Sequence, residues 1–173
     1  DAVVANAQSL PGYLTMMASH NAAEGTATSY RQKSISRQFQ ERQTDKTYQA
    51  IVAGHLDGQG TVDVPVIYDP SRPPLHIAEP SHNKPAVTEW KAIEHFEIQG
   101  QPVTRVALTP ITGRSHQLRV HMQFLGHPIV GDTLYAAPDQ QDLMPRLCLH
   151  AERLSFHHPQ TNERIEFICP VPF

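Results

Sequence analysis

Residues 109–121, with the sequence TPITGRSHQLRVH, decide how this chain is expected to fold. Pro110 and Gly113 interrupt a strand-like run at residues 103–108, because both residues are strong breakers of regular structure. An apolar face with helical spacing follows, made of Leu118, Met122 and Leu125. Ser115 stands just before this face and can cap the first helical turn. The stretch therefore predicts a strand, a tight turn and a helix in direct succession.

The charge pattern around this stretch favours an anionic ligand. No carboxylate occurs between Glu97 and Asp132, whereas the same segment carries the basic or titratable residues Arg105, Arg114, His116, Arg119, His121 and His127. At about 100° per residue, one edge of the apolar face carries Arg114, Gln117 and His121, and the other side carries His116, Arg119 and Gln123. A helix start of this kind suits an anion, although a solvated amphipathic helix would show the same pattern.

Length and composition limit the class of protein. With 173 residues and 39% hydrophobic residues, the chain is expected to form one domain, residues 1–173. No apolar run approaches the ~20 residues of a membrane-spanning helix, and no signal-peptide pattern is present. A net charge of −3 argues against nucleic-acid binding by bulk charge, but it allows a local basic cleft. We expect a cytoplasmic protein.

The histidines and cysteines do not suggest a metal centre. The sequence has eleven histidines but no H-E-x-x-H motif, and no carboxylate lies near His116 or His121. The two cysteines, Cys148 and Cys169, are expected to be buried thiols. We therefore predict neither a metal nor a disulfide.

The remaining elements follow from local patterns. A basic amphipathic helix is predicted at residues 31–43 and loop or disorder at residues 21–29. Strands are predicted at residues 46–53, 61–68, 86–96, 103–108, 147–156 and 164–168. The proline-rich segment 69–85 is expected to be an irregular connection. This order predicts an α+β fold with a mixed, mostly antiparallel central sheet and a few helices.

Several ordered motifs resemble one known family. They are the TPITGRSHQLRVHM run, the LGHPIVGD run at residues 125–132, Lys46-Thr47-Tyr48 and Leu147-Cys148-Leu149-His150-Ala151. From about Arg31 to the C-terminus the chain resembles the RluA family of RNA pseudouridine synthases. The resemblance implies a bent central sheet with the active cleft across it.

The resemblance also implies an activity. Such enzymes break the N-glycosidic bond of a uridine, rotate the uracil and rejoin it through carbon, without a cofactor. The implied partner is ribosomal RNA, transfer RNA or both, with the target base flipped out of its stack. We expect an isomerase that acts as a monomer.

Family positions carry over residue by residue. By resemblance, Tyr48 lies against the target base, and Arg114 pairs with the catalytic aspartate. Leu149 closes the base pocket. The residues expected to line the cleft or bind phosphate are His116, Gln117, Arg119 and His121, of which His121 is the most structural.

The family's catalytic aspartate has no counterpart here. It belongs to a His-Arg-Leu-Asp-x-x-Thr-Ser-Gly run, of which only the tail resembles Ala27-Thr28-Ser29. Counting back places the aspartate at Gly25, and no aspartate occurs between Asp1 and Asp45. Deleting the strand that follows this motif would cost about as much as the whole ~5–15 kcal/mol stability of a domain. We therefore expect residues 1–30 to be atypical and the sequence to lack residues that the complete protein has.

Two other functions stay open. A catalytically inactive RNA-binding relative would explain the absent aspartate. A histidine-dependent phosphoester hydrolase would need His116 and His121 to reach one phosphate, but helical geometry separates them by about 140°, which argues against it.

Overall fold

The longest hairpin of the chain joins β5 (Val87–Ile98) to β6 (Gln101–Pro110). Its two-residue loop, Gln99-Gly100, has positive φ at both positions, 52° and 76°. Such a turn matches the right-handed twist of paired strands, so it closes the hairpin without splaying it. The register of β5 against β6 shifts once, between Ala92 and Glu94, as a β-bulge does.

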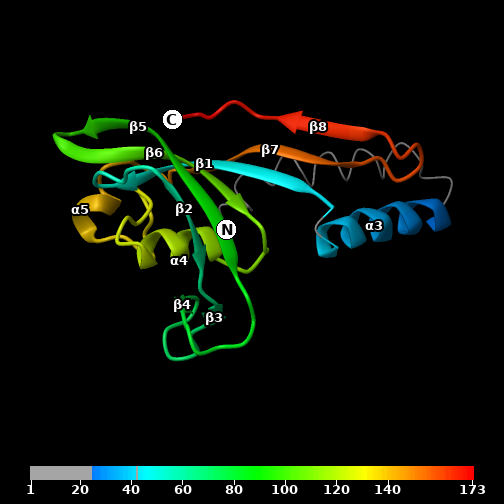
Figure 1. Ribbon diagram of the computed structural model, residues 1–173, viewed down its shortest axis with the longest axis horizontal. Coiled ribbons are helices and arrows are strands. Elements are labelled where there is room, and N and C mark those ends of the chain that lie inside the picture. The colour runs from blue at the N-terminus through cyan, green and yellow to red at the C-terminus, as the bar shows by residue number, and fades with distance from the viewer. Residues whose placement is uncertain (1–24, 42) are drawn as a thin grey trace. The chain divides into compact units, whose positions relative to one another are not determined.

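The computed structural model describes residues 25–41 and 43–173, which fall into two compact units. The larger unit holds residues 47–150 and 171–173, and the smaller unit holds the described residues up to 46 together with residues 151–170. Figure 1 gives the element labels. The interpretation of the chain as one domain stays a prediction.

The larger unit is built on antiparallel strands in the order β2-β5-β6-β1. Its other elements are β1 (Asp45–Ala53), β2 (Gln59–Asp63), β3 (Val66–Tyr68), β4 (His76–Ala78), α4 (Gln117–Phe124), α5 (Pro138–Gln141) and the start of β7 (Leu149–His157). Helix α4 contacts β4, β5 and β6 and runs along the hairpin (Figure 1). Fully buried apolar side chains fill the interior, among them Val103, Val106, Leu108, Met122 and Ile129. Their burial is the main source of stability for this unit.

The smaller unit packs α3 (Gly25–Gln40) with the hairpin of β7 and β8 (Arg164–Ile168). Its apolar cluster consists of Ile35, Leu154 and Phe156, with Phe39 and Phe167 against it. Gln38 ties the helix to the hairpin, because its amide donates to the His157 carbonyl at 2.8 Å and accepts from the His157 N–H at 2.7 Å. Arg164 pairs with Asp45, the first residue of β1.

The predicted architecture is confirmed, with local corrections. The fold is α+β and mostly antiparallel, and each predicted strand is found near its expected place. Helix α3 begins at Gly25, so the loop predicted at residues 21–29 is wrong from that residue on; residues 21–24 lie outside the described part. The strand predicted at residues 61–68 is two strands, because Pro65 interrupts its ladder.

The two cysteines differ in environment. Cys148 is buried, and burial raises the pKa of its thiol to about 11. Cys169 is exposed, so the prediction that both thiols are buried is wrong for this residue. Within residues 25–41 and 43–173, no helix has the length and apolar character needed to cross a membrane.

Replacing Gly131 by alanine is expected to destabilise the larger unit severely. The added Cβ would lie 1.9 Å from the Arg146 carbonyl oxygen, and the backbone φ is +73°. We expect a loss of about 3 kcal/mol or more in the free energy of unfolding, measured by urea denaturation. Gly58→Ala is the matched control, since its φ is +81° with nothing within 4 Å, and it should cost only about 1–2 kcal/mol. Equal losses would contradict the assigned backbone contact.

Candidate functional site: the turn between β6 and α4

The side chain of Gln117 organises the turn that leads from β6 into α4. Its Oε1 accepts from the Thr112 hydroxyl at 2.7 Å and from the Arg114 N–H at 3.0 Å. Its Nε2 donates to the Val87 carbonyl at 2.9 Å and to the Thr88 hydroxyl at 3.0 Å. Gln117, Thr88 and Thr112 are all buried, so the bonds to these two hydroxyls satisfy groups that water does not reach. The turn is thereby attached to the start of β5.

The network continues from Gln117 to His121. The Val64 carbonyl can only accept, so His121 Nε2 donates to it at 2.8 Å. In the neutral ring Nδ1 then accepts from the Thr88 hydroxyl, also at 2.8 Å, and Thr88 accepts from Gln117. The ring is fully buried, and burial lowers its pKa. Both ring nitrogens are therefore occupied, which makes His121 structural as predicted and removes the basis for a two-histidine hydrolase.

His116, not Ser115, is the N-cap of α4. It has φ 54° and ψ 13°, a left-handed conformation that is uncommon for residues with a side chain, and it makes no side-chain capping bond. The prediction of a Ser115 cap is wrong because the chain turns through His116 before helical bonding begins. His116 Nδ1 instead lies 2.6 Å from the Tyr135 hydroxyl.

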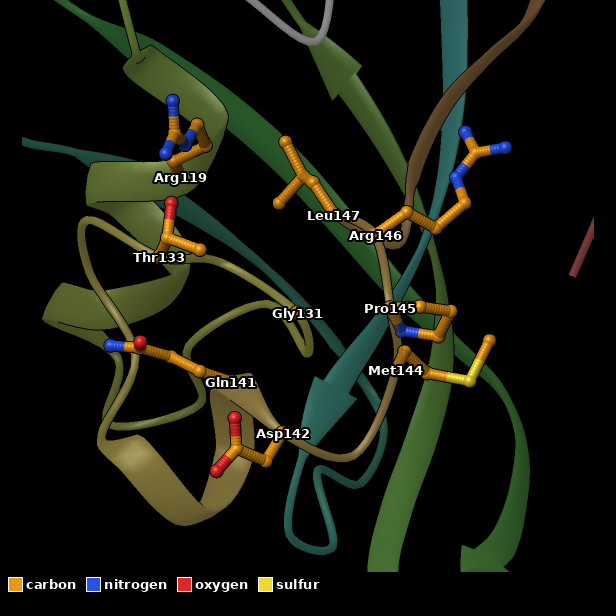
Figure 2. A pocket seen from close by; sticks show the side chains of 9 residues that line it. All are labelled: Arg119, Gly131, Thr133, Gln141, Asp142, Met144, Pro145, Arg146 and Leu147. Atoms are coloured by element: carbon orange, nitrogen blue, oxygen red, sulfur yellow. The ribbon is translucent and has the colours of Figure 1, made fainter.

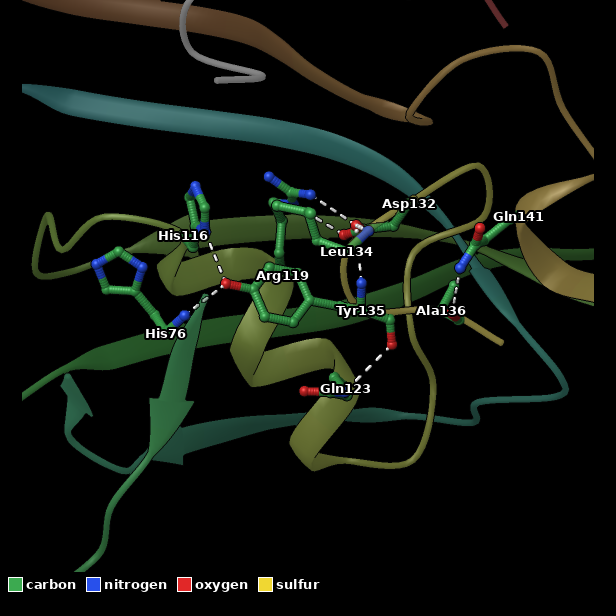
Figure 3. Close-up of polar contacts among 9 residues, drawn as sticks. All are labelled: His76, His116, Arg119, Gln123, Asp132, Leu134, Tyr135, Ala136 and Gln141. Carbon is green, nitrogen blue, oxygen red and sulfur yellow. Dashed lines mark hydrogen bonds and ion pairs between the residues drawn. The ribbon is translucent and has the colours of Figure 1, made fainter. Parts of the chain in front are cut away.

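Arg119 forms a buried ion pair with Asp132 (Figure 3). Its Nε and Nη2 lie 2.8 and 2.6 Å from the two carboxylate oxygens, and the side chains are 7% and 0% exposed. Its guanidinium carbon also lies 4.9 Å from the centre of the Tyr135 ring. Bidentate pairing of this kind satisfies a buried guanidinium. The phosphate or cleft role predicted for Arg119 stays a prediction, but its charge is already matched inside the protein.

Arg114 is placed differently. It is half-buried, and its Nε donates to the Pro85 carbonyl at 3.2 Å. No carboxylate of residues 25–41 and 43–173 forms an ion pair with it. The two arginines of the RSHQLR run thus lie in different environments. The charge of Arg119 is paired with Asp132 in the interior, whereas Arg114 lies on the turn.

The other predicted site residues lie on neighbouring strands. Tyr48 is on β1, opposite Leu108 of β6, and burial raises the pKa of its phenol. The phenol is therefore protonated at neutral pH and can donate a hydrogen bond. Leu149 begins β7 and is buried; it follows Cys148, whose carbonyl accepts from the Ile51 N–H of β1. The strand β1 therefore carries Tyr48 and is also hydrogen-bonded to Cys148, the residue before Leu149.

A cavity of about 410 Å³ lies elsewhere in the larger unit (Figure 2). Arg119, Thr133 and Gln141 lie on one side and residues 144–147 on the other. Of the predicted site residues, only Arg119 lines it. Within the described part of the chain, no group of three or more His, Cys, Asp or Glu side chains is arranged to hold a metal ion.

Sequence reasoning missed the residues that support the turn. In the sequence, Asp132 ends both the acid-free segment and the LGHPIVGD run, and no role is predicted for Asp132 or Tyr135. The signal was available, because a carboxylate ending an acid-free segment is a natural partner for one of its arginines. The sequence does not show which arginine pairs with Asp132, because this depends on how residues 126–132 fold back against α4.

Comparison with known proteins identifies the family. A family model described as RNA pseudouridylate synthase matches residues 26–124. A protein named dual-specificity RNA pseudouridine synthase RluA from Pasteurella multocida is 49% identical over 142 residues, which cover 82% of this chain and 64% of that protein. The protein of the same name from Escherichia coli K12 is 45% identical over 144 residues, with the same coverage.

A solved structure agrees. Human RNA pseudouridylate synthase domain containing 1 matches with a TM-score of 0.74 and 35% identity, covering 86% of this chain and 62% of that chain. The antiparallel α+β fold is thus that of the pseudouridine synthase class. The chain belongs to the RNA pseudouridylate synthase family, which confirms the resemblance. It spans 64% of the length of the curated relatives described above.

Removing the Gln117 amide is expected to loosen the turn. Gln117→Ala leaves the buried Thr88 and Thr112 hydroxyls short of partners, and each unsatisfied group costs about 1–3 kcal/mol. The free energy of unfolding should fall accordingly in urea denaturation. Gln123→Ala is the control on the same helix, because that side chain is exposed and, among the described residues, donates one bond, to the Tyr135 carbonyl. A Gln117→Ala loss no larger than the Gln123→Ala loss would exclude the network as an anchor.

Stability should fall on acidification between about pH 6.5 and pH 4. Burial, with the charges of Arg119 and His76, lowers the pKa of His116 from 6.5 to about 4. In this range the unfolded chain binds a proton that the folded chain does not, so the stabilisation is complete above 6.5 and is lost as the pH falls. Urea denaturation at several pH values measures the slope, and His116→Gln should reduce it. An unchanged slope in that variant would assign the acid sensitivity to other groups.

Proposed function

We propose that this chain is an RNA pseudouridine synthase that isomerises accessible uridines in ribosomal RNA, transfer RNA or both. Membership of the family supports the reaction, and the dual-specificity names of the relatives support the two RNA classes. The proposal includes a cytoplasmic monomer that needs no cofactor. The observation that carries it is the placement of Arg114 on the turn, with no carboxylate partner among the described residues.

In this proposal Arg114 orients the catalytic carboxylate. The Arg114 N–H donates to Gln117, and its Nε donates to the Pro85 carbonyl. These two contacts fix both ends of the side chain and leave the terminal nitrogens of the guanidinium to bind a carboxylate. A planar guanidinium pairs with a carboxylate through two parallel hydrogen bonds, which sets both distance and direction. An arginine fixed at its base and left without an acid nearby suits this role.

Tyr48 and Leu149 would form the floor of the uracil site. Tyr48 is protonated at neutral pH because burial raises its pKa, so it would donate to the base rather than remove a proton from it. Leu149 would pack against one face of the uracil, since flipped bases are commonly held between apolar or aromatic side chains. Both roles are proposals that rest on the family resemblance and on their neighbouring strands.

Gln117 and Arg119 would act on RNA only indirectly. All four hydrogen bonds of the Gln117 amide are made within the chain, and the Arg119 guanidinium is paired with Asp132. A direct RNA contact would have to break these buried bonds, at a cost of several kcal/mol for the ion pair. Their substrate-binding role is therefore proposed as support of the turn.

The sequence also favours a second candidate, an RNA-binding relative without catalysis. No aspartate occurs between Asp1 and Asp45, and the position that matches the family's aspartate is Gly25, where α3 begins. Such a protein would keep the cleft and its affinity for RNA while forming no pseudouridine.

The two functions are separated by one assay on the purified full-length protein, including the residues that the sequence is expected to lack. Ribosomal RNA and transfer RNA carrying tritium at uracil C5 release that tritium when the new bond forms at C5. We expect release with the wild-type chain and a loss of about 100-fold or more in Arg114→Met, the scale of a lost electrostatic contact in a transition state. Arg153→Met, which removes an exposed ion pair with Glu166, is the control and should keep full activity.

Other outcomes decide against the proposal. Tight RNA binding without tritium release would establish the non-catalytic candidate. Release that is unchanged in Arg114→Met would remove this arginine from the catalytic site while leaving the activity in place.

A further inference from the structure

Tyr68 presents a large aromatic ring to solvent at the end of β3. Half of its surface is accessible, and no hydrogen bond of its hydroxyl is found among the described residues. A single exposed apolar side chain is ordinary on a protein surface and by itself indicates nothing. The surroundings of Tyr68 therefore have to show whether the ring has a ligand.

The ring of Tyr68 is linked to the turn between β6 and α4 by two aromatic contacts. Tyr68 pairs with His76 across the β3–β4 hairpin, with ring centres 5.6 Å apart and planes at 67°. The His76 ring centre lies 4.8 Å from that of His116, the N-cap of α4 (Figure 3). An exposed ring thus stands close to the turn that carries Arg114.

The hairpin that carries Tyr68 is anchored on α4. Residues two apart on a strand lie on the same side, so Tyr68 shares a side of β3 with Val66. Val66 is buried against Val120 of α4 and against Tyr135. The His76 N–H also donates to the Tyr135 hydroxyl at 2.9 Å. These contacts fix the strand pair, so the ring of Tyr68 is placed before any ligand arrives.

The loop after Tyr68 is ordered by one buried carboxylate. Asp69 Oδ1 accepts from the N–H and the hydroxyl of Ser71, at 3.0 and 2.6 Å, and Oδ2 accepts from Arg72 Nε at 2.8 Å. The Asp69 N–H donates to the Leu75 carbonyl at 2.9 Å, which closes the loop. The Arg72 side chain is nevertheless 64% exposed. The loop therefore holds an accessible guanidinium four residues after Tyr68.

These features match an unpaired nucleobase. Proteins that bind single-stranded RNA combine aromatic rings, on which bases stack, with basic side chains for the phosphates. Tyr68 supplies a ring, and Arg72 and Arg114 supply guanidinium groups from the loop and from the turn. A stable protein–protein interface covers about 800 Å² on each partner, far more than one half-exposed ring offers. A flat base needs only the face of that ring.

We propose that Tyr68 stacks on one unpaired nucleobase of the RNA, a neighbour of the target uridine in its loop, while Arg72 contacts the phosphate of that nucleotide. This inference rests on the proposed function and deepens it, because it adds a second contact site for the same substrate. Stacking tolerates any base, since every base has a flat π face. The site therefore positions the RNA loop without reading its sequence.

Stacking is tested by the affinity of the full-length protein for an RNA hairpin with a uridine in its loop. Loss of one stacked base predicts that Tyr68→Ala raises Kd by about 5- to 150-fold. Tyr68→Leu should lose most of the same affinity, because it keeps an apolar side chain without a ring. Tyr68→Phe keeps the ring and should bind within twofold of the wild type, which also shows that the hairpin is folded.

Phe124→Ala is the matched control. Phe124 is 51% exposed, but it is the last residue of α4, eight residues and about 12 Å along the helix from the N-cap. We expect its affinity for the RNA hairpin to equal that of the wild type. An equal loss in Phe124→Ala and Tyr68→Ala would overturn the proposal, because any exposed aromatic residue would then serve.

A fluorescent base gives a direct readout of the contact. 2-Aminopurine is placed in the RNA loop on either side of the target uridine, one position at a time. Stacking on an aromatic ring quenches its emission, so at one of the two positions the wild-type complex should be dimmer than the Tyr68→Ala complex. Equal emission of the two complexes at both positions would overturn the stacking site.

The phosphate contact is tested by the salt dependence of binding. Arg72→Gln should lower the slope of log Kd against log salt by about 0.7, the value for one phosphate contact on a single strand. Arg153→Gln is the control, because Arg153 is also an exposed arginine paired with a carboxylate, but in the smaller unit. Equal slopes for Arg72→Gln and the wild type would remove Arg72 from the site.

The outcomes separate this inference from the proposed function. RNA binding that depends on the Tyr68 ring, without tritium release from uracil C5, would refute the proposed catalysis and leave the stacking site in place. Tritium release with wild-type affinity in Tyr68→Ala would overturn the stacking site alone. Affinity retained by Tyr68→Leu as well as by Tyr68→Phe would show an apolar contact in place of stacking. Absence of RNA binding by the wild-type protein would refute both.

Discussion

The hydrogen-bonded amide of Gln117 is the constraint on which the described site depends. One side chain joins the turn, the first residues of β5 and, through Thr88, the ring of His121. Every partner is a directional group, and several are buried, so the amide cannot rotate without leaving donors or acceptors unpaired. The turn that carries Arg114 is therefore set by the interior of the larger unit.

A second constraint acts from the other side of α4. The Arg119–Asp132 pair brings residues 131–136 against the helix and fixes Tyr135 beside His116. Such a pair adds little stability relative to a well-packed apolar contact, but breaking one half of it typically costs about 3–5 kcal/mol. Its value here is geometric, because it holds residues 132–135 against α4.

Prediction from sequence succeeded where the signal is local. The strand, turn and helix at residues 101–124 follow from breakers and periodicity, and His121 was recognised as structural. It failed where the environment of a residue depends on residues that are distant in the sequence. Ser115 has the chemistry of a cap, yet His116 takes that position, and its ring is hydrogen-bonded to the Tyr135 hydroxyl, 19 residues away. Cys148 and Cys169 look alike in sequence but differ in exposure, since one precedes β7 in the interior and the other follows β8.

The sequence alone determined the family, the order of most elements and the set of candidate site residues, because motifs and periodicity are properties of neighbouring positions. Tertiary structure decided which of those candidates are paired inside the protein. Arg114 and Arg119 occur in one short run with equal charge, but only Arg119 meets the Asp132 carboxylate that the chain brings back after the helix. A charge that is buried must find a partner, and the identity of that partner is set by the path of the backbone in space rather than by spacing along the chain.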